Sequence, residues 1–362
     1  MPAPSTDPSL AGHHRQIDGL RVFAMLGVFY VHFWNPAPLI EHARVSLFFV
    51  VSGFLITTML LRARGSATPL RVARNFYIRR GLRLLPPLLL ALGLADVFNM
   101  ADVRHSMLWH LFQLTNVYAY LTQSWDPWVT AHLWSLNTLE QFYLFAPLAM
   151  LLLTRTQAIS AALLLLVASV LIRVHRADLG LNDWIGMPVS YDPVAGGALL
   201  ALLMPVTALQ DALRSRTALT TAALVIGAPL ALGAHFGTSE TYRLLLIPAL
   251  VCLVSAAWHG FGGPLGWLLG HPALAFLSKI SYGAYIYHFP LWWLIGERYP
   301  ALFTTGPRTF LVMSAASLLL ATLSWYGLER HCAALKRHFP TRQPPPPPIP
   351  LHPKITAEQT AA

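Results

Sequence analysis

The strongest constraint on this chain is a series of apolar segments, each long enough to cross a lipid bilayer as a helix. About 20 apolar residues span a hydrocarbon core of ~30 Å, and only a helix or a closed barrel satisfies its backbone hydrogen bonds there. Ten segments meet this requirement, namely residues 18–38, 45–61, 84–100, 133–153, 158–174, 188–204, 219–235, 243–258, 281–297 and 309–328. The sequence therefore predicts an all-α, polytopic membrane bundle of about ten transmembrane helices.

Composition excludes the soluble alternatives. Of the 362 residues, 55% are hydrophobic and only 11% are charged, whereas soluble globular proteins carry roughly 25% charged residues. A water-soluble enzyme or a disordered scaffold would need more polar surface than this chain has. The two cysteines, Cys252 and Cys332, support no disulfide framework. The net charge of +10 is divided among short clusters between apolar runs, so we interpret it as membrane topology rather than nucleic-acid binding.

The distribution of arginine predicts the topology. An eleventh apolar stretch, residues 107–122, is interrupted by polar residues and either crosses the membrane or lies along its interface. Ten crossings with both termini in the cytoplasm put the excess of Lys and Arg on the cytoplasmic side. The largest contribution comes from one acid-free stretch that contains Arg62, Arg64, Arg71, Arg74, Arg79, Arg80 and Arg83. An eleventh crossing would reverse every later loop, so ten is the predicted number.

The chain divides into three regions. Residues 1–16 form a polar cytoplasmic N-terminus, residues 17–330 form the membrane domain, and residues 331–362 form a basic, proline-rich cytoplasmic tail. The first apolar segment carries charged residues and lacks the smooth apolar core of a signal peptide, so we expect it to be retained. The run of prolines in the tail predicts an extended polyproline spacer, with partner binding as the alternative.

Ionisable residues at membrane depth mark candidate functional positions, because each costs about 2.5 to 3.5 kcal/mol to insert. Arg21 and His32 lie in the first span and Glu140 lies in the fourth. The 11-residue separation puts Arg21 and His32 on one helix face, ~16 Å apart along the axis. His32 and Glu140 lie at similar depth below the outer surface and are expected to meet, and a carboxylate beside an imidazole suits a general base or nucleophile. Arg80 and Arg83 join Arg21 in a cationic cluster nearer the cytoplasm. A buried histidine that a neighbouring helix satisfies is the structural alternative.

Other candidates are weaker. Ser52, Tyr282 and His288 are expected to line the same cavity, although tight helix packing accounts equally well for Ser52, and for His288 a structural role or acceptor contact is favoured over chemistry. His13 and His14 are too few to form a metal site, and no metal is predicted. We find no internal repeat and no hydrolase, zinc-protease or nucleotide-binding motif.

Five blocks of the chain then follow one another in a characteristic order. They are IDGLRVFAMLGVFYVH (residues 17–32), FFVVSGFLIT (48–57), RRGLRLLPP (79–87), LWSLNTLEQFYLFAP (133–147) and ISYGAYIYHFPL (280–291). Together they resemble the acyltransferase-3 family of integral membrane O-acyltransferases, and the resemblance covers essentially the whole membrane region.

The resemblance implies transfer of an acyl group, commonly acetyl, from cytoplasmic acyl-CoA to a hydroxyl group. By the same resemblance, His32 corresponds to the family's essential histidine, Arg21 to its paired arginine, and Arg80 with Arg83 to the motif associated with the donor. Many relatives carry two consecutive acids in the fourth block, whereas this chain has Leu139 before Glu140. Some relatives also carry an extracytoplasmic SGNH hydrolase-like domain. This chain ends soon after its last span, so we expect a standalone enzyme.

The expected acceptor is an extracytoplasmic or lipid-linked glycan, such as an exopolysaccharide or O-antigen unit, in the inner membrane of a bacterium. We expect acyl-CoA as the donor substrate and no permanently bound cofactor. We expect the lipid bilayer as the surroundings, polysaccharide-assembly proteins as candidate partners, and no nucleic-acid partner. Acylation of a small secondary metabolite is one alternative. A proton-coupled transporter or flippase, in which Glu140 and His32 titrate without acyl chemistry, is the alternative from another class. A structural subunit that uses the proline-rich tail is a third.

Overall fold

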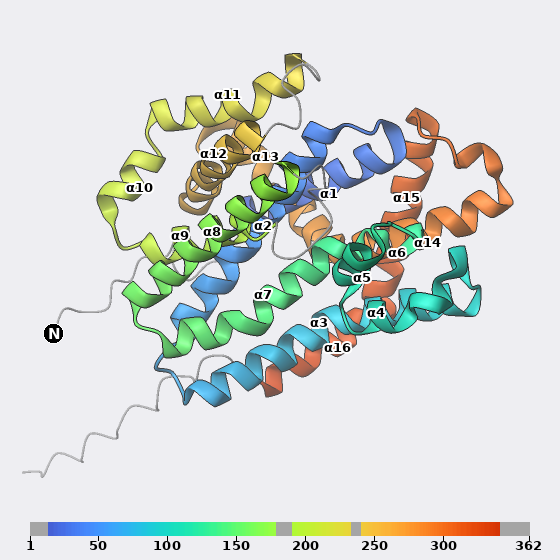
Figure 1. The fold of residues 1–362 in the computed structure, drawn as a ribbon, viewed down its shortest axis with the longest axis horizontal. Coiled ribbons are helices and arrows are strands. Elements are labelled where there is room, and N and C mark those ends of the chain that lie inside the picture. Colours follow the sequence, from blue (N-terminus) through green and yellow to red (C-terminus); the bar gives the residue numbers. More distant parts are fainter. Residues whose placement is uncertain (1–13, 179–189, 233–239, 341–362) are drawn as a thin grey trace, which may run out of the picture.

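The computed structural model describes residues 14–178, 190–232 and 240–340, and every regular element among these residues is helical (Figure 1). The α-helices are α1 (Arg15–Phe29), α2 (Pro38–Ala63), α3 (Pro69–Val97), α4 (Met107–Leu111), α5 (Thr115–Thr122), α6 (Trp128–Ala131), α7 (Leu133–Leu152), α8 (Arg155–Asp178), α9 (Asp192–Leu203), α10 (Thr207–Leu213), α11 (Arg216–Leu232), α12 (Glu240–His259), α13 (Gly263–Leu269), α14 (Pro272–Arg298), α15 (Pro307–Ser324) and α16 (Arg330–Ala334). Short 3₁₀ or π turns are η2 (Tyr30–Trp34), η3 (Met100–Ser106), η5 (Pro300–Leu302), η6 (Trp325–Glu329) and η7 (Leu335–His338). The predicted all-α class is confirmed for the described residues.

Local sequence explains where several long helices begin. A proline occupies the first turn of α2, α3, α14 and α15. Proline is favoured there because its fixed φ suits a helix and its missing N–H would have no partner within the helix. The predicted second and third spans consequently begin earlier than expected, at Pro38 and Pro69.

The chain is a multi-pass membrane protein, although the number of crossings is not confirmed. Within the described ranges, five helical stretches are long and apolar enough to cross a membrane: Arg15–Trp34, Pro38–Ala63, Arg155–His175, Thr241–His259 and Pro307–His338. A sixth would combine Pro69–Val97 with Met100–Leu111 across a bend of 105°. The other predicted spans fall on α7, α9, α11 and α14, which are shorter or less apolar. Residues 188–189 and 233–235 of two predicted spans lie outside the described residues.

Residues 107–122 form two short helices, α4 and α5, instead of one continuous helix. Polar side chains in this region bond inward. His110 contacts the hydroxyl groups of Ser106 and Thr115, at 3.0 and 2.9 Å, and the backbone N–H of Thr115 donates to Asn137 on α7. A stretch that satisfies its polar groups against α7 has a role other than a simple lipid-facing span.

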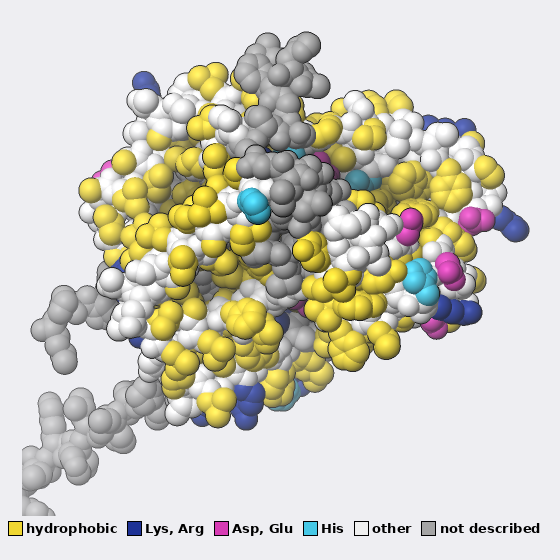
Figure 2. Space-filling view, in the orientation of Figure 1, with side chains coloured by type: hydrophobic (Ala, Val, Ile, Leu, Met, Phe, Trp, Pro, Cys, Tyr) yellow, Lys and Arg dark blue, Asp and Glu magenta, His cyan; other side chains and the backbone are white. Residues whose placement is uncertain are grey.

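The lipid-compatible surface is largely leucine. Figure 2 shows hydrophobic side chains spread over much of one face, with Lys and Arg concentrated toward its margins. The exposed large apolar residues include Leu148, Leu152, Leu164, Leu171, Leu311 and Leu319. Exposure of this kind costs nothing in a bilayer, whereas it would cost free energy in water.

Two contacts fix the elements that carry the site. Gly53 of α2 and Gly197 of α9 lie at a close helix crossing, because a Cβ on Gly53 would meet the Val194 carbonyl oxygen and one on Gly197 would meet the Val50 carbonyl oxygen. Small residues allow such close approach between membrane helices. In the second contact, α16 packs against α3 (Figure 1), and η7 follows α16 in the chain. The first part of the predicted tail is therefore helical, whereas residues 341–362 and most of the predicted N-terminal region, residues 1–13, lie outside the described residues.

Candidate active site

A pair of histidines from the first and ninth predicted spans forms the centre of the site. His32 lies in η2, a π-helical turn that extends α1, and His288 lies in the middle of α14. The distance from His32 Nδ1 to His288 Nε2 is 2.8 Å, and the two rings stack with 5.0 Å between their centroids. His288 is completely buried, whereas the His32 side chain remains 16% exposed. A substrate can therefore reach His32 more easily than His288. π-Helical turns of this kind frequently occur at functional sites.

The hydrogen bonds of this pair assign the tautomers of two neutral rings. His288 Nδ1 lies 2.5 Å from the Tyr285 carbonyl oxygen, which can only accept, so Nδ1 of His288 carries the proton. His288 Nε2 is then an acceptor, and the bond at 2.8 Å requires His32 Nδ1 to donate. The lone pair of His32 is consequently on Nε2. A second group that fixes the reactive nitrogen in this way is the usual arrangement for a histidine base.

Arg44 and Glu41, both on α2, surround that nitrogen. Arg44 Nη2 lies 3.2 Å from His32 Nε2, and the Arg44 Nε–H donates to Glu41 Oε2 at 2.8 Å. Glu41 Oε2 lies 4.0 Å from His32 Nε2. The carboxylate beside the imidazole is therefore Glu41, and the expectation that His32 meets Glu140 is wrong.

The reason for this correction is helix packing. Depth in the membrane places His32 and Glu140 at one level, but α1 packs against α2 and α14, so its histidine meets residues of those helices. Because α2 begins at Pro38 rather than at residue 45, Glu41 and Arg44 belong to the helix instead of a loop. The sequence signal for this pair is an acidic and a basic residue three positions apart, Glu41 and Arg44, at the start of an apolar segment. They were not predicted as site residues.

Glu140 lies instead with the predicted arginines. A cavity of about 260 Å³ is lined by Arg21, Ser52, Arg80, Arg83, Glu140 and Tyr282, among others. These six residues were singled out from the sequence, and the structure brings them together. Arg79 and Lys336 also line this cavity and were not predicted as site residues. With five cations and one carboxylate, the cavity suits a strongly anionic ligand.

Several contacts hold the cationic side chains in this cavity, which we call the arginine cavity. The Arg80 guanidinium lies over the Tyr143 ring, 4.3 Å from its centroid. The Arg79 guanidinium donates to the Lys336 carbonyl oxygen at 2.9 Å, which fixes η7 below α3. Tyr282 donates its hydroxyl to the Leu84 carbonyl oxygen at 3.0 Å. The cavity wall is therefore built from α1, α2, α3, α7, α14 and η7.

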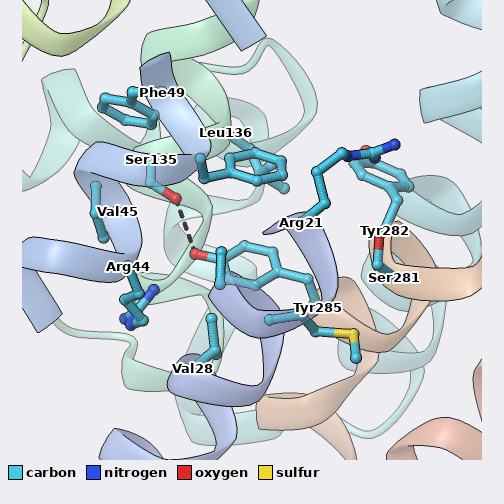
Figure 3. A pocket seen from close by; sticks show the side chains of 13 residues that line it. Arg21, Val28, Arg44, Val45, Phe49, Ser135, Leu136, Ser281, Tyr282 and Tyr285 are labelled. Carbon is cyan, nitrogen blue, oxygen red and sulfur yellow. Dashed lines mark hydrogen bonds between the residues drawn. The ribbon is translucent and has the colours of Figure 1, made fainter. Parts of the chain in front are cut away.

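Arg21 connects the arginine cavity to the histidine pair. A smaller cavity of about 40 Å³ is lined by Arg21 and Tyr282, which it shares with the arginine cavity, and by Arg44, which contacts His32. Figure 3 shows Arg21 and Arg44 on opposite sides of the hydrogen bond between Ser135 and Tyr285, whose oxygens are 2.8 Å apart. The two cavities thus share part of their walls, and the smaller one reaches Arg44 beside His32 Nε2.

The chemistry of the side chains determines which kind of ligand the site can hold. Among residues 14–178, 190–232 and 240–340, no group of three or more His, Cys, Asp or Glu side chains is placed to hold a metal ion. The arginines of the larger cavity instead suit an anion such as phosphate, because guanidinium groups bind phosphate through paired hydrogen bonds.

The fold and the site together define a multi-pass helical membrane protein in which a cationic cavity and a pair of histidines lie on either side of a smaller cavity. The sequence matches the profile of the acyltransferase-3 family, described as an acyltransferase domain, over residues 14–326. The chain therefore belongs to this family, as its five sequence blocks predict.

Two similar proteins match this chain over about half of their own length. The Bacillus subtilis protein named "Putative peptidoglycan O-acetyltransferase YrhL" is 31% identical over 315 residues, which cover 77% of this chain and 49% of the relative. The Listeria monocytogenes "Peptidoglycan O-acetyltransferase OatA" is 25% identical over 355 residues, which cover 86% of this chain and 54% of the relative. This chain spans about half the length of these two relatives. No solved structure gives a significant match.

Proposed function

We propose that this chain is an O-acetyltransferase of the bacterial inner membrane, which moves an acetyl group from cytoplasmic acyl-CoA to a hydroxyl of an extracytoplasmic glycan. The observation that carries this proposal is that the arginine cavity shares Arg21 and Tyr282 with a smaller cavity, which is lined in turn by Arg44, the residue that contacts His32. Acetyl-CoA is a substrate here, and no permanently bound cofactor is required.

The arginine cavity would hold the phosphate-bearing end of the donor. Arg79, Arg80, Arg83 and Lys336 supply positive charge at its wall, and the positive-inside rule assigns these arginines to the cytoplasmic side. The helical rise of ~16 Å between Arg21 and His32 is of the same order as the length of the pantetheine arm. A donor anchored at the arginines therefore carries its thioester toward His32.

His32 would act as the general base. Its Nε2 takes the proton of the acceptor hydroxyl while that oxygen attacks the thioester carbonyl. The carbon–sulfur bond then breaks, the thiolate leaves with CoA, and the proton passes from His32 to the sulfur. In the structure Arg44 donates to the lone pair of Nε2, so the acceptor hydroxyl would have to displace the guanidinium before Nε2 can take its proton. The displaced guanidinium would then stabilise the oxyanion.

His288 would be a positioning residue. It accepts from His32 Nδ1 and so keeps the lone pair on the nitrogen that faces Arg44. A neutral acceptor at Nδ1 also stabilises the imidazolium that forms when Nε2 takes the proton. Glu41 would hold the Arg44 guanidinium in place.

The acceptor class follows from the membrane setting and from the relatives. Two of the named relatives are described as acting on peptidoglycan, which favours a cell-wall glycan or its lipid-linked precursor here. An exopolysaccharide or O-antigen unit presents the same chemistry, a sugar hydroxyl at the outer membrane surface. Polysaccharide-assembly proteins are the corresponding partners.

The test is acetyl transfer from radiolabelled acetyl-CoA in membranes that contain the wild-type chain or its His32→Ala variant. The labelled product is fractionated into polymer, lipid-linked glycan and small molecules. His331→Ala is the matched control, because His331 is exposed and lies outside both cavities. Label that needs His32 but tolerates loss of His331 supports the proposal, and its fraction identifies the acceptor. No label dependent on His32, in correctly inserted protein with an acceptor pool present, would refute it and favour proton-coupled transport.

A further inference from the structure

A second cationic cavity lies apart from the site described above. It has a volume of about 400 Å³ and is lined by Thr58, Leu61, Arg62, Arg64, Arg155, Ala201, Met204, Pro205 and Trp258. It shares no lining residue with the arginine cavity or with the smaller cavity. Three of its residues are arginines and none is acidic. Because the proposed reaction does not use it, this cavity needs a separate explanation.

The residues of this second cavity come from one end of several membrane helices. Arg62 lies in the last turn of α2 and Arg64 is its C-cap, while Arg155 is the first residue of α8. Met204 is the C-cap of α9, and Trp258 is next to last in α12. The positive-inside rule assigns this end to the cytoplasmic surface of the bilayer.

The wall of the cavity is preorganised. The Arg62 guanidinium lies over the Trp258 ring, 5.1 Å from its centroid. Trp258 is itself fixed by His14, whose ring stacks on it at 3.4 Å, and by Phe54, which packs edge-on at 4.9 Å. Arg155 donates to the Leu202 carbonyl oxygen at the end of α9. Two of the three arginines are thus held in place by other groups, and Arg64 is exposed.

Helix dipoles alone do not account for this much positive charge. The C-terminal ends of α2, α9 and α12 each contribute about −0.5 charge, and the N-terminal end of α8 contributes about +0.5. Three arginines add three full positive charges, so a net charge of about +2 remains at the cavity. This excess is suited to a phosphate group carrying one or two negative charges.

We propose that this cavity binds the phosphate headgroup of an anionic phospholipid from the cytoplasmic leaflet. Arginine binds phosphate oxygens through paired hydrogen bonds, and basic pockets between helices on the cytoplasmic side are a known mode of anionic lipid recognition. The remaining wall, which includes Leu61, Ala201 and Met204, is apolar and suits the glycerol and the first methylene groups of the acyl chains. A volume of about 400 Å³ lies within the range of small-ligand sites.

The test measures lipid binding to the purified full chain in nanodiscs and by native mass spectrometry. The probes are dioleoyl phosphatidylglycerol and cardiolipin, with dioleoyl phosphatidylcholine as the neutral comparison. The first test variant is R62Q/R64Q, which leaves the hydrogen bond between Arg155 and Leu202 intact. The second, R62Q/R64Q/R155Q, removes all three arginines of the cavity. The control variants are R71Q/R74Q and R71Q/R74Q/R216Q, which remove the same number of exposed arginines outside the cavity.

We expect the wild type to retain anionic lipid at least tenfold more tightly than phosphatidylcholine, and R62Q/R64Q to lose about tenfold of that affinity, the value of roughly one strong charge-assisted contact. The control variants should bind like the wild type, and every variant should have the wild-type melting temperature in phosphatidylcholine. Equal loss in the test and control variants would reduce the effect to general surface charge and overturn the proposal. Saturable binding of inorganic phosphate or glycerol 3-phosphate in neutral nanodiscs, without preference for anionic lipid, would identify a soluble phosphate as the ligand and also overturn it.

Discussion

Replacement of His288 by leucine is the sharpest test of the proposed mechanism. Leucine fills most of the volume of the imidazole but cannot accept the hydrogen bond from His32 Nδ1, which is 2.8 Å long in the wild type. The variant leaves a buried N–H without a partner and no longer holds the lone pair on Nε2. An unsatisfied buried donor costs about 1 to 3 kcal/mol, and if this cost is realised in the transition state, kcat should fall about 10- to 100-fold.

The assay separates this effect from a general loss of structure. Neither cavity that leads to His32 is lined by His288, so the KM for acetyl-CoA should stay within about twofold of the wild-type value while kcat falls. His288→Gln offers a side-chain oxygen that can accept from Nδ1 and should recover part of kcat. A leucine variant with kcat within twofold of the wild type, or one whose loss lies only in KM, would refute the assignment of His288 as a positioning residue.

Three further predictions concern other parts of the site. Glu41→Gln should lower kcat about tenfold, because Arg44 loses its charged partner, whereas Glu140→Gln should change mainly the KM for acetyl-CoA; steady-state kinetics over a range of donor concentrations distinguish the two. Lys336→Ala should raise that KM about five- to tenfold, as expected for the loss of one partly exposed phosphate contact; steady-state kinetics measures the KM, and isothermal titration calorimetry with CoA should show a matching rise in Kd. Gly53→Ala should destabilise the protein by about 1 to 3 kcal/mol through the clash with α9, whereas Gly227→Ala, with no atom within 4 Å of its Cβ, should not; thermal unfolding in a fixed lipid gives both values.

Controls for these predictions come from neighbouring positions. Arg337 follows Lys336 but is exposed and does not line the cavity, so Arg337→Ala should leave the KM unchanged. Equal effects of Lys336→Ala and Arg337→Ala would mean that the segment only contributes general charge. A larger fall in kcat for Glu140→Gln than for Glu41→Gln would restore Glu140 as the catalytic carboxylate.

The sequence predicted the helical class and the grouping of three arginines of the arginine cavity, for a physical reason. An ionisable side chain at membrane depth must face a cavity or a partner, and Arg21, Arg80 and Arg83 lie near the same predicted membrane surface. The same comparison of depths placed Glu140 beside His32, whereas the structure places Glu140 with the arginines.

The partners of His32 could not be found in the same way. Depth is one coordinate, and which helices become neighbours is decided by packing, which involves residues far apart in the sequence. The contact with His288 joins residues 256 positions apart. Hydropathy predicts that the second span begins at residue 45, whereas the helix begins two turns earlier, at Pro38. Glu41 and Arg44 therefore lie outside the predicted span and were not predicted as site residues.

One helix, α2, carries residues of every cavity discussed here. Arg44 stands at the histidine pair, Ser52 lines the arginine cavity, and Arg62 lines the proposed lipid site. With 26 residues, α2 is ~39 Å long, and Gly53 holds it close against α9 near its middle. Because a helix is stiff over this length, a shift of α2 along its axis would move Arg44 away from His32 and change the arginine cavity at the same time. Tight packing at Gly53 against α9 therefore holds Arg44 and Ser52 in position relative to the residues that they face on other helices.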